Sequence, residues 1–472
     1  MTWRFGAVRR LTSALLLVGF ASCGDSADRA SSTLPPESGP EILIDSSIRH
    51  QVISGWEATT QAGQLHASYP LFRDSVLSRG VNELGINRLR LEVRSGSENT
   101  HDWFADFQTG RIDMATWRCH RYAPVNDNPD PQQRRDAGFF FTEMDDKIEQ
   151  VVLPVRALLA GQGESLYLNV TFVAFSRQAC GTSVLVHDDP EEYAEFALAT
   201  VQHMDARYGL VPDAWEVILE PDNTDFWRGR QIGEAIVAAA KRFAAHGYGH
   251  ITFVGPSNTN MSRATAYFDD LAKVPGALAH VSEIAYHRYG GVSQSTLNAL
   301  ADRAESNHIG TAMLEHIGSD YEDLHDDLTI ANNSAWQQFA LAFTKTEDDG
   351  AQYYLVDASN PSAPRITPGS RTPFLRQYFR FIRRGAQRIG AASRRASLDP
   401  VAFINPTGKW VVVVKSDGAA SFAVGGLPAG RYGVSHTTTS GSIVAAPITV
   451  TSSGVASLTI PGRGVLTVSG EP

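Results

Sequence analysis

INRLRLEV, residues 86–93, alternates strictly between polar and apolar side chains. Its charged residues, Arg88, Arg90 and Glu92, fall on one face of a strand, and the apolar residues between them fall on the other. An exposed edge strand would show this pattern. A strand of a closed barrel would show it too, with its apolar residues packed on outer helices and its charged residues pointed at a site.

The rest of the chain favours the barrel. Strands that alternate with helices indicate parallel βαβ units, and eight such strands indicate an α/β fold of the (β/α)8 TIM barrel type. The competing architecture, a doubly wound open sheet, needs a glycine-rich loop after its first strand, and GWEATTQAG does not supply one. The eight strand-like runs are residues 53–56, 86–93, 166–175, 215–220, 250–256, 283–291, 311–318 and 351–359.

A second domain is indicated at the C-terminus. Residues 398–472 contain short strand-like runs separated by Gly, Asn-Pro and Ser turns, without a helical pattern, which predicts an antiparallel β-sandwich. Residues 41–53 read as two short strands around a turn. We expect these strands to join the sandwich, because a strand that precedes the first barrel strand needs a partner. Residues 54–397 are then the barrel.

The N-terminus has the pattern of an export signal. Residues 1–23 combine a positively charged start with an apolar run that is too short to span a bilayer. Cys23 follows small residues, which resembles the lipobox of bacterial lipoproteins and implies lipidation at Cys23. The alternative is an ordinary secretory signal. We therefore expect an exported, periplasmic or cell-surface lipoprotein attached to the membrane, with residues 24–40 as a flexible linker.

Composition narrows the possible partners. The net charge is −10 without a long basic run, which argues against a nucleic-acid partner. Cys119 and Cys180 remain once Cys23 is set aside, and outside the cytoplasm they could form one disulfide or stay as buried thiols. Their spacing does not indicate a metal site. We expect no metal and no cofactor, and a monomer.

Two glutamates stand near the ends of strand-like runs. Glu220 ends WEVILE, and Glu315 lies in TAMLEHIG. Catalytic groups of a TIM barrel sit at the C-terminal ends of its strands, so both carboxyls should face one cleft. Glycoside hydrolysis needs two carboxyls, one to protonate the leaving oxygen and one to attack the anomeric carbon. The long segment 94–141 would cover this cleft, and its aromatic residues could stack on sugars or pack the segment onto the barrel.

The chain resembles clan A of the glycoside hydrolases, and family 30 most of all. WEVILEP resembles the acid/base strand, AMLEHIG the nucleophile strand, and YHRYGG the motif of strand six. Residues 372–391, TPFLRQYFRFIRRGAQRIGA, resemble the connection between the last barrel helix and the sandwich. The resemblance covers roughly residues 41–470.

The resemblance implies a role for each matching residue. Glu220 would be the general acid/base and Glu315 the nucleophile of a retaining double displacement on a β-linked glycan. Tyr289 would donate a hydrogen bond to the nucleophile, and His287 would line the cleft beside it. Arg90 would keep the nucleophile ionised.

Three positions near the cleft complete the expected site. Trp56 stands where the family's first strand approaches the non-reducing sugar. Leu219 replaces the asparagine that the clan uses to hydrogen-bond the sugar 2-hydroxyl, and Asn223 is a candidate substitute for it. Because of Leu219, a non-catalytic carbohydrate-binding lipoprotein on the same fold is the alternative function.

Overall fold

The computed structural model describes residues 38–180, 185–224 and 226–470. The predicted signal segment with Cys23, and most of the predicted linker, lie outside the described residues. Within those described, no helix is long and apolar enough to cross a membrane.

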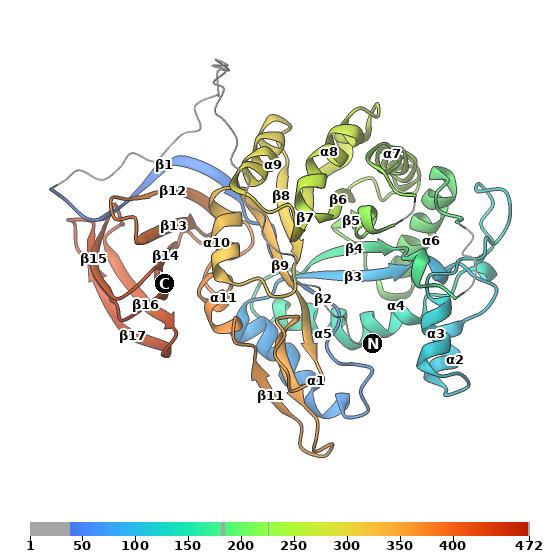
Figure 1. The fold of residues 1–472 in the computed structure, drawn as a ribbon, viewed down its shortest axis with the longest axis horizontal. Coiled ribbons are helices and arrows are strands. Elements are labelled where there is room, and N and C mark those ends of the chain that lie inside the picture. Colours follow the sequence, from blue (N-terminus) through green and yellow to red (C-terminus); the bar gives the residue numbers. More distant parts are fainter. Residues whose placement is uncertain (1–37, 181–184, 225, 471–472) are drawn as a thin grey trace, which may run out of the picture. The chain divides into compact units, whose positions relative to one another are not determined.

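Eight parallel strands close into a barrel, which confirms the predicted fold (Figure 1). Each strand pairs with the next in chain order, and the last pairs with both the seventh and the first. The strands are β2 (Gly55–Thr59), β3 (Arg88–Arg94), β4 (Tyr167–Val173), β5 (Ala214–Glu216), β6 (Thr252–Asn260), β7 (Val281–Gly290), β8 (Gly310–Glu315) and β9 (Asn333–Phe343).

The eighth barrel strand differs from the one predicted. The eighth strand of the ring is β9. The predicted residues 351–359 instead contain β10 (Gln352–Asp357), which lies outside the ring. There β10 pairs with β9 on one side and with β11 (Arg365–Pro368) on the other. The sequence pattern did not predict β9, because Gln337 and Gln338 interrupt the apolar run of this strand. Both amides are buried in the structure, where Gln337 donates to the Leu314 carbonyl and Gln338 to the Gly350 carbonyl.

Helices surround the barrel (Figure 1). Local signals set their ends, as in the longest of them, where the Asp189 carboxylate accepts hydrogen bonds from the first backbone N–H groups and Gly209 ends the helix in a left-handed conformation. The helices with eight or more residues are α1 (Tyr69–Ser78), α5 (Leu153–Ala160), α6 (Pro190–Tyr208), α7 (Gly229–Ala245), α8 (Met261–Ala272), α9 (Gln294–Ser306), α10 (Tyr321–Thr329) and α11 (Thr372–Phe379).

The long segment after β3 folds into short helices, α2 (Trp103–Gln108) and α3 (Met114–His120), before α4 (Thr142–Lys147) begins. Its aromatic side chains stack on one another, with Trp117 on Phe107 at 5.1 Å between ring centroids. A disulfide joins Cys119 to Cys180, the pairing that the sequence left open. The segment is therefore packed and cross-linked at the barrel end that carries the strand C-termini.

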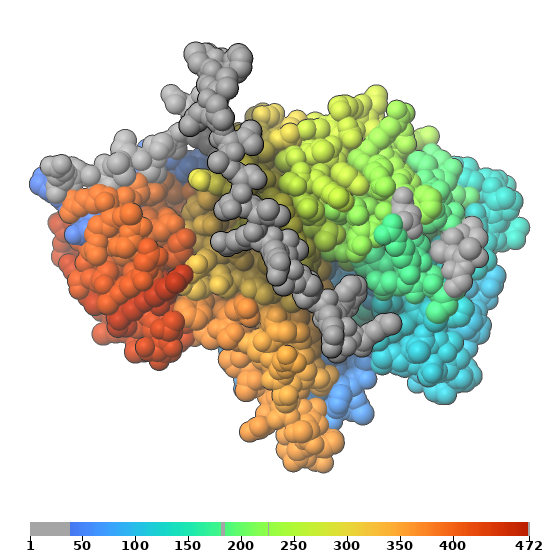
Figure 2. Space-filling model, in the orientation of Figure 1, coloured from blue at the N-terminus to red at the C-terminus, as the bar shows by residue number. Residues whose placement is uncertain are grey.

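The second domain is a nine-stranded sheet with the order β17-β16-β19-β14-β13-β12-β1-β15-β18, drawn at the orange-to-red end of the chain in Figure 2. Residues 41–53 contribute one continuous strand, not two, and it pairs with β12 and β15. The domain begins at β12, earlier than the predicted boundary at 398. Its strands are β1 (Ile42–Val52), β12 (Gln387–Ser393), β13 (Leu398–Ile404), β14 (Trp410–Ser416), β15 (Ala420–Gly425), β16 (Gly430–Thr438), β17 (Gly441–Val450), β18 (Val455–Ile460) and β19 (Gly464–Gly470).

Trp56 belongs to the core between the barrel and α11. Its indole is fully buried and stacks on Phe379 at 4.5 Å, and its Nε1 donates a hydrogen bond to the Ile382 carbonyl 2.6 Å away. The expectation that Trp56 contacts a sugar is therefore wrong. Because side chains alternate along a strand, the neighbouring Glu57 takes the interior face of β2 and Trp56 the face toward the helices.

Truncating Trp56 should therefore destabilise the protein. We expect Trp56→Ala to lower the free energy of unfolding by about 3–5 kcal/mol, the usual cost of a cavity left by a large core side chain. Equilibrium unfolding in urea measures this change. Leu71→Ala is the matched control, because the Leu71 side chain is exposed on α1 and its loss should change stability by less than about 0.5 kcal/mol. A loss below that control level for Trp56→Ala would contradict the packing described.

Candidate active site

Glu315 and Glu220 reach the same end of the barrel by different backbone routes. Glu315 is the last residue of β8, and β5 ends at Glu216, short of the strand predicted over 215–220. The chain still continues along the barrel, because the Leu219 and Glu220 N–H groups donate to the carbonyls of Phe172 and Ser257. Glu220 itself has φ 52°, in the left-handed region that residues other than glycine rarely adopt. Such strain often marks a functional position.

Glu315 is held by a cation and a phenol. The Arg90 guanidinium on β3 donates to Glu315 Oε2 and, at 3.0 Å, to the Leu314 carbonyl. The Tyr289 hydroxyl on β7 donates to Glu315 Oε1 at 3.0 Å. Arg90 is fully buried, so its charge acts on the carboxylate through a low-dielectric interior. The geometry fits a carboxylate that is fixed in orientation beside a permanent positive charge.

Glu220 is held by a histidine and an amide. His287 Nδ1 lies 3.1 Å from Glu220 Oε1, and Asn223 Nδ2 donates to Glu220 Oε2 at 3.2 Å. Asn223 thus contacts the predicted acid/base directly. His287 is fully buried, and its other ring nitrogen, Nε2, has no partner among the described residues.

Glu220 and His287 shift each other's pKa in opposite directions. Burial raises the pKa of Glu220, but the His287 hydrogen bond and charge, then Asn223 and Arg90, bring that pKa below its ordinary value. Burial lowers the pKa of His287, but its hydrogen bond to Glu220 and the charges of Glu315 and Glu220 bring that pKa above its ordinary value. Each group therefore favours the charged form of the other.

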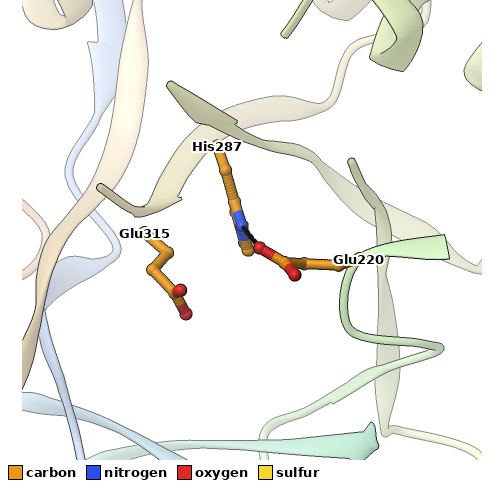
Figure 3. A group of neighbouring side chains, drawn as sticks. All are labelled: Glu220, His287 and Glu315. Atoms are coloured by element: carbon orange, nitrogen blue, oxygen red, sulfur yellow. Dashed lines mark hydrogen bonds and ion pairs between the residues drawn. The ribbon is translucent and has the colours of Figure 1, made fainter. Parts of the chain in front are cut away.

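Figure 3 shows Glu220, His287 and Glu315 converging on one space. One side-chain oxygen or nitrogen of each lies within 4.8 Å of the others. Imidazole and carboxylate are also metal ligands, so this group is the set of side chains that could hold a cation. Arg90 opposes a divalent cation there, because its guanidinium already neutralises Glu315. The arrangement suits proton transfer at Glu220 together with nucleophilic attack by Glu315.

Leu219 packs in a small apolar cluster with Tyr122 and Val173. Tyr122 belongs to the long segment, and its hydroxyl is hydrogen-bonded to Arg94 at the end of β3. Sequence reasoning missed both residues. Arg94 continues the alternation of charged residues along β3, which was a usable signal, whereas only the tertiary structure brings Tyr122 to Leu219.

The protein is similar to known proteins in the sequence of its second domain and in its fold. Residues 385–468 match the family model described as the glycosyl hydrolase family 30 beta sandwich domain. No curated protein matches the sequence.

Solved structures of family 30 enzymes share the whole architecture. The family 30 subfamily 8 xylanase from Clostridium acetobutylicum aligns with a TM-score of 0.65 and 17% identity over 92% of this chain and 100% of that one. A family 30 endoxylanase from Clostridium papyrosolvens C71 aligns with a TM-score of 0.63 and 19% identity, covering 92% of this chain and 100% of that one. The catalytic domain of the family 30 xylanase C from Talaromyces cellulolyticus aligns with a TM-score of 0.64 and 14% identity, covering 91% of this chain and 100% of that one. At these identities the likeness establishes the fold.

The Glu220–His287 contact predicts a measurable titration. In Glu220→Gln the acceptor charge is lost while burial and Arg90 remain, and both of these lower the pKa of His287. We therefore expect the pKa of His287 to fall relative to the unmodified protein. Nitrogen-15 NMR of histidine-labelled protein measures it, with Glu305→Gln on the exposed surface of α9 as control. An unchanged pKa in Glu220→Gln would contradict the electrostatic contact between Glu220 and His287.

The Leu219 environment predicts that restoring asparagine is unfavourable. Leu219→Asn would bury an amide against apolar neighbours and remove packed methyl groups, so we expect a loss of about 2–4 kcal/mol in the free energy of unfolding. Leu219→Met keeps the volume and should cost less than about 1.5 kcal/mol. Urea unfolding of the two variants compares them directly. Equal stability of the two variants would show that the cluster accommodates a polar group.

Proposed function

We propose that the protein is a retaining glycoside hydrolase that cleaves a β-linked glycan. The observation that carries the proposal is the facing pair Glu220 and Glu315 at the C-terminal end of a TIM barrel. Retaining enzymes hold their two carboxyls about 5–5.5 Å apart, and inverting enzymes about 6.5–9.5 Å. Oxygens within 4.8 Å of each other support the retaining arrangement. The similar structures are described as xylanases, which supports a polysaccharide or oligosaccharide substrate.

The reaction follows from the two environments. A Glu315 oxygen attacks the anomeric carbon while the bond to the leaving oxygen breaks, and Glu220 gives that oxygen a proton. Water then attacks the same carbon, returns a proton to Glu220, and frees Glu315. Arg90 and Tyr289 hold the Glu315 carboxylate in orientation for the first step. His287 supplies the proton that Glu220 must carry, through the Nδ1–Oε1 contact.

Export and anchoring complete the proposal. The N-terminal pattern supports a periplasmic or cell-surface lipoprotein attached through Cys23. The Cys119–Cys180 disulfide supports an oxidising compartment, since cytosolic thiols stay reduced.

Removing the nucleophile should abolish hydrolysis. We expect Glu315→Ala to lower kcat for an activated aryl β-glycoside by a factor on the order of 10⁴ or more, as for other covalent nucleophiles. Added azide should restore cleavage and give a glycosyl azide of inverted configuration, because azide enters from the face that Glu315 vacates. The anomer is assigned by proton NMR.

Glu347→Ala is the control, since Glu347 is exposed on the loop after β9 and should leave kcat unchanged. Full activity in Glu315→Ala would exclude the proposed nucleophile. A wild-type protein that binds oligosaccharides but hydrolyses no glycoside in a broad panel would instead favour the non-catalytic carbohydrate-binding protein.

A further inference from the structure

The long segment meets α6 through a cluster of four carboxyl groups, which we call the carboxyl cluster. Glu98 and Asp127 come from the segment, and Glu192 and Glu195 come from α6. The two α6 residues are three positions apart, so they share one face of the helix. Glu195 is only 3% exposed. The residues that surround Glu220 and Glu315 in the proposed active site are not members of this cluster.

Hydrogen bonds join the segment to its surroundings at the carboxyl cluster. The Glu98 carboxylate accepts a hydrogen bond from the Asp127 N–H at 2.8 Å and contacts His187 Nε2 at 2.7 Å. The Asn126 side-chain amide donates to Glu192 Oε1 at 3.2 Å, which links the segment directly to α6. These contacts use only part of the capacity of the cluster to accept hydrogen bonds.

Four carboxyl oxygens of the cluster are buried without a donor. They are both oxygens of Glu195, Oε2 of Glu192 and Oδ1 of Asp127, none of which has a hydrogen-bond partner among the residues that the structure describes. A buried ionised carboxylate without a partner is unfavourable. A protonated carboxyl carries no charge and supplies an O–H donor, which a neighbouring carboxylate can accept. The arrangement therefore favours carboxyls that hold protons between them.

The electrostatic surroundings act in the same direction. Burial, followed by the charges of the other three members of the cluster, raises the pKa of Glu195 to about 8. Burial also raises the pKa of Glu192. At neutral pH, Glu195 is therefore mostly protonated.

The basic residues next to the cluster do not remove this effect. His187 contacts one member of the cluster, and Arg135 donates its backbone N–H to another. Arg242 on α7 lowers the pKa of Glu195, but its guanidinium pairs with Glu191 at 2.8 Å. The pKa of Glu195 therefore stays raised in the presence of all three basic residues.

Docking of the segment on α6 also affects the barrel end that carries Glu220. Tyr122 lies in the segment four positions before Asn126, and its ring packs on Leu219, the residue before Glu220. The Tyr122 hydroxyl is hydrogen-bonded to Arg94. A segment that loosens at the carboxyl cluster would weaken the packing beside Glu220.

We propose that protons held between Glu195 and its neighbouring carboxyls fasten residues 126–138 of the segment to α6. The segment is then docked at acidic and neutral pH. At alkaline pH the carboxyls lose these protons, repel one another, and the segment loosens. This proton-dependent contact does not depend on the proposed hydrolase function.

The pH dependence of unfolding tests the proton. Between 4.5, the ordinary pKa of a glutamate, and about 8, the folded protein holds a proton that the unfolded chain has released, so stability falls as the pH rises through this range. In urea unfolding from pH 5 to 8, the ratio of the unfolding constant of the unmodified protein to that of Glu195→Gln should rise by up to about tenfold per pH unit. Parallel pH profiles for the two proteins would overturn the proposal.

Two further variants support this comparison. Glu305→Gln, on the exposed surface of α9, is the matched control and should keep the pH dependence of the unmodified protein. Asp127→Asn removes a neighbouring negative charge and should reduce that dependence, which provides a second test should Glu195→Gln fail to fold. A pH dependence that is unchanged in Asp127→Asn would contradict the cluster.

Hydrogen exchange locates the loosening. Between pH 6 and pH 9, exchange of the amides in residues 126–138, corrected for the intrinsic effect of pH, should increase several-fold in the unmodified protein but not in Glu195→Gln. The amides of α9 are the internal control. Exchange in 126–138 that is the same at both pH values would overturn the proposal.

Added calcium chloride tests whether the cluster holds a cation instead of protons. At pH 9 it should leave the stability of the unmodified protein and of Glu195→Gln equally affected. Stabilisation of the unmodified protein alone would show that a cation, not protons, joins the carboxyls, and would also overturn the proposal.

Discussion

The cost of burying charge organises the barrel interior. The inward face of β3 carries Arg88, Arg90, Glu92 and Arg94, all of them buried. A charge in a protein interior is tolerated only when it is paired and hydrogen-bonded, so each of these residues requires a partner from another element. Arg88 and Arg90 find their partners on other barrel strands, whereas Glu92 and Arg94 pair with each other and with residues of α4.

The charged residues of β3 pair with different parts of the molecule from the start of the strand to its end. Near its start, Arg88 makes a bidentate contact with Glu283 on β7 at 2.8 Å and a second contact with Glu57 on β2, deep in the barrel. In the middle, Arg90 fixes Glu315 at the mouth of the cleft. At the end, Arg94 joins the long segment through Tyr122 and α4 through Glu143. One strand therefore contributes to the core, to the surroundings of the proposed nucleophile and to the docking of the long segment in succession.

The two glutamates are unequal in their surroundings. Glu315 is paired with the permanently charged Arg90, whereas Glu220 contacts the titratable His287 and has a strained backbone. A group that must gain and lose a proton in one turnover is better served by a titratable neighbour than by an arginine. The absence of the usual asparagine before Glu220 fits the same picture, because Leu219 serves the packing of Tyr122 rather than the cleft.

The sequence by itself determined the βα alternation, the position of Glu315 at a strand end, and the shared face of Arg88, Arg90 and Glu92, because period-two and helical patterns are local properties of the chain. It did not determine which face of β2 points inward, so Trp56 was misplaced, nor that β9, with its buried glutamines, closes the ring. The left-handed Glu220 and its pairing with His287 arise only when residues far apart in the chain meet. Those contacts depend on burial and on partners supplied by other elements, which no local pattern encodes.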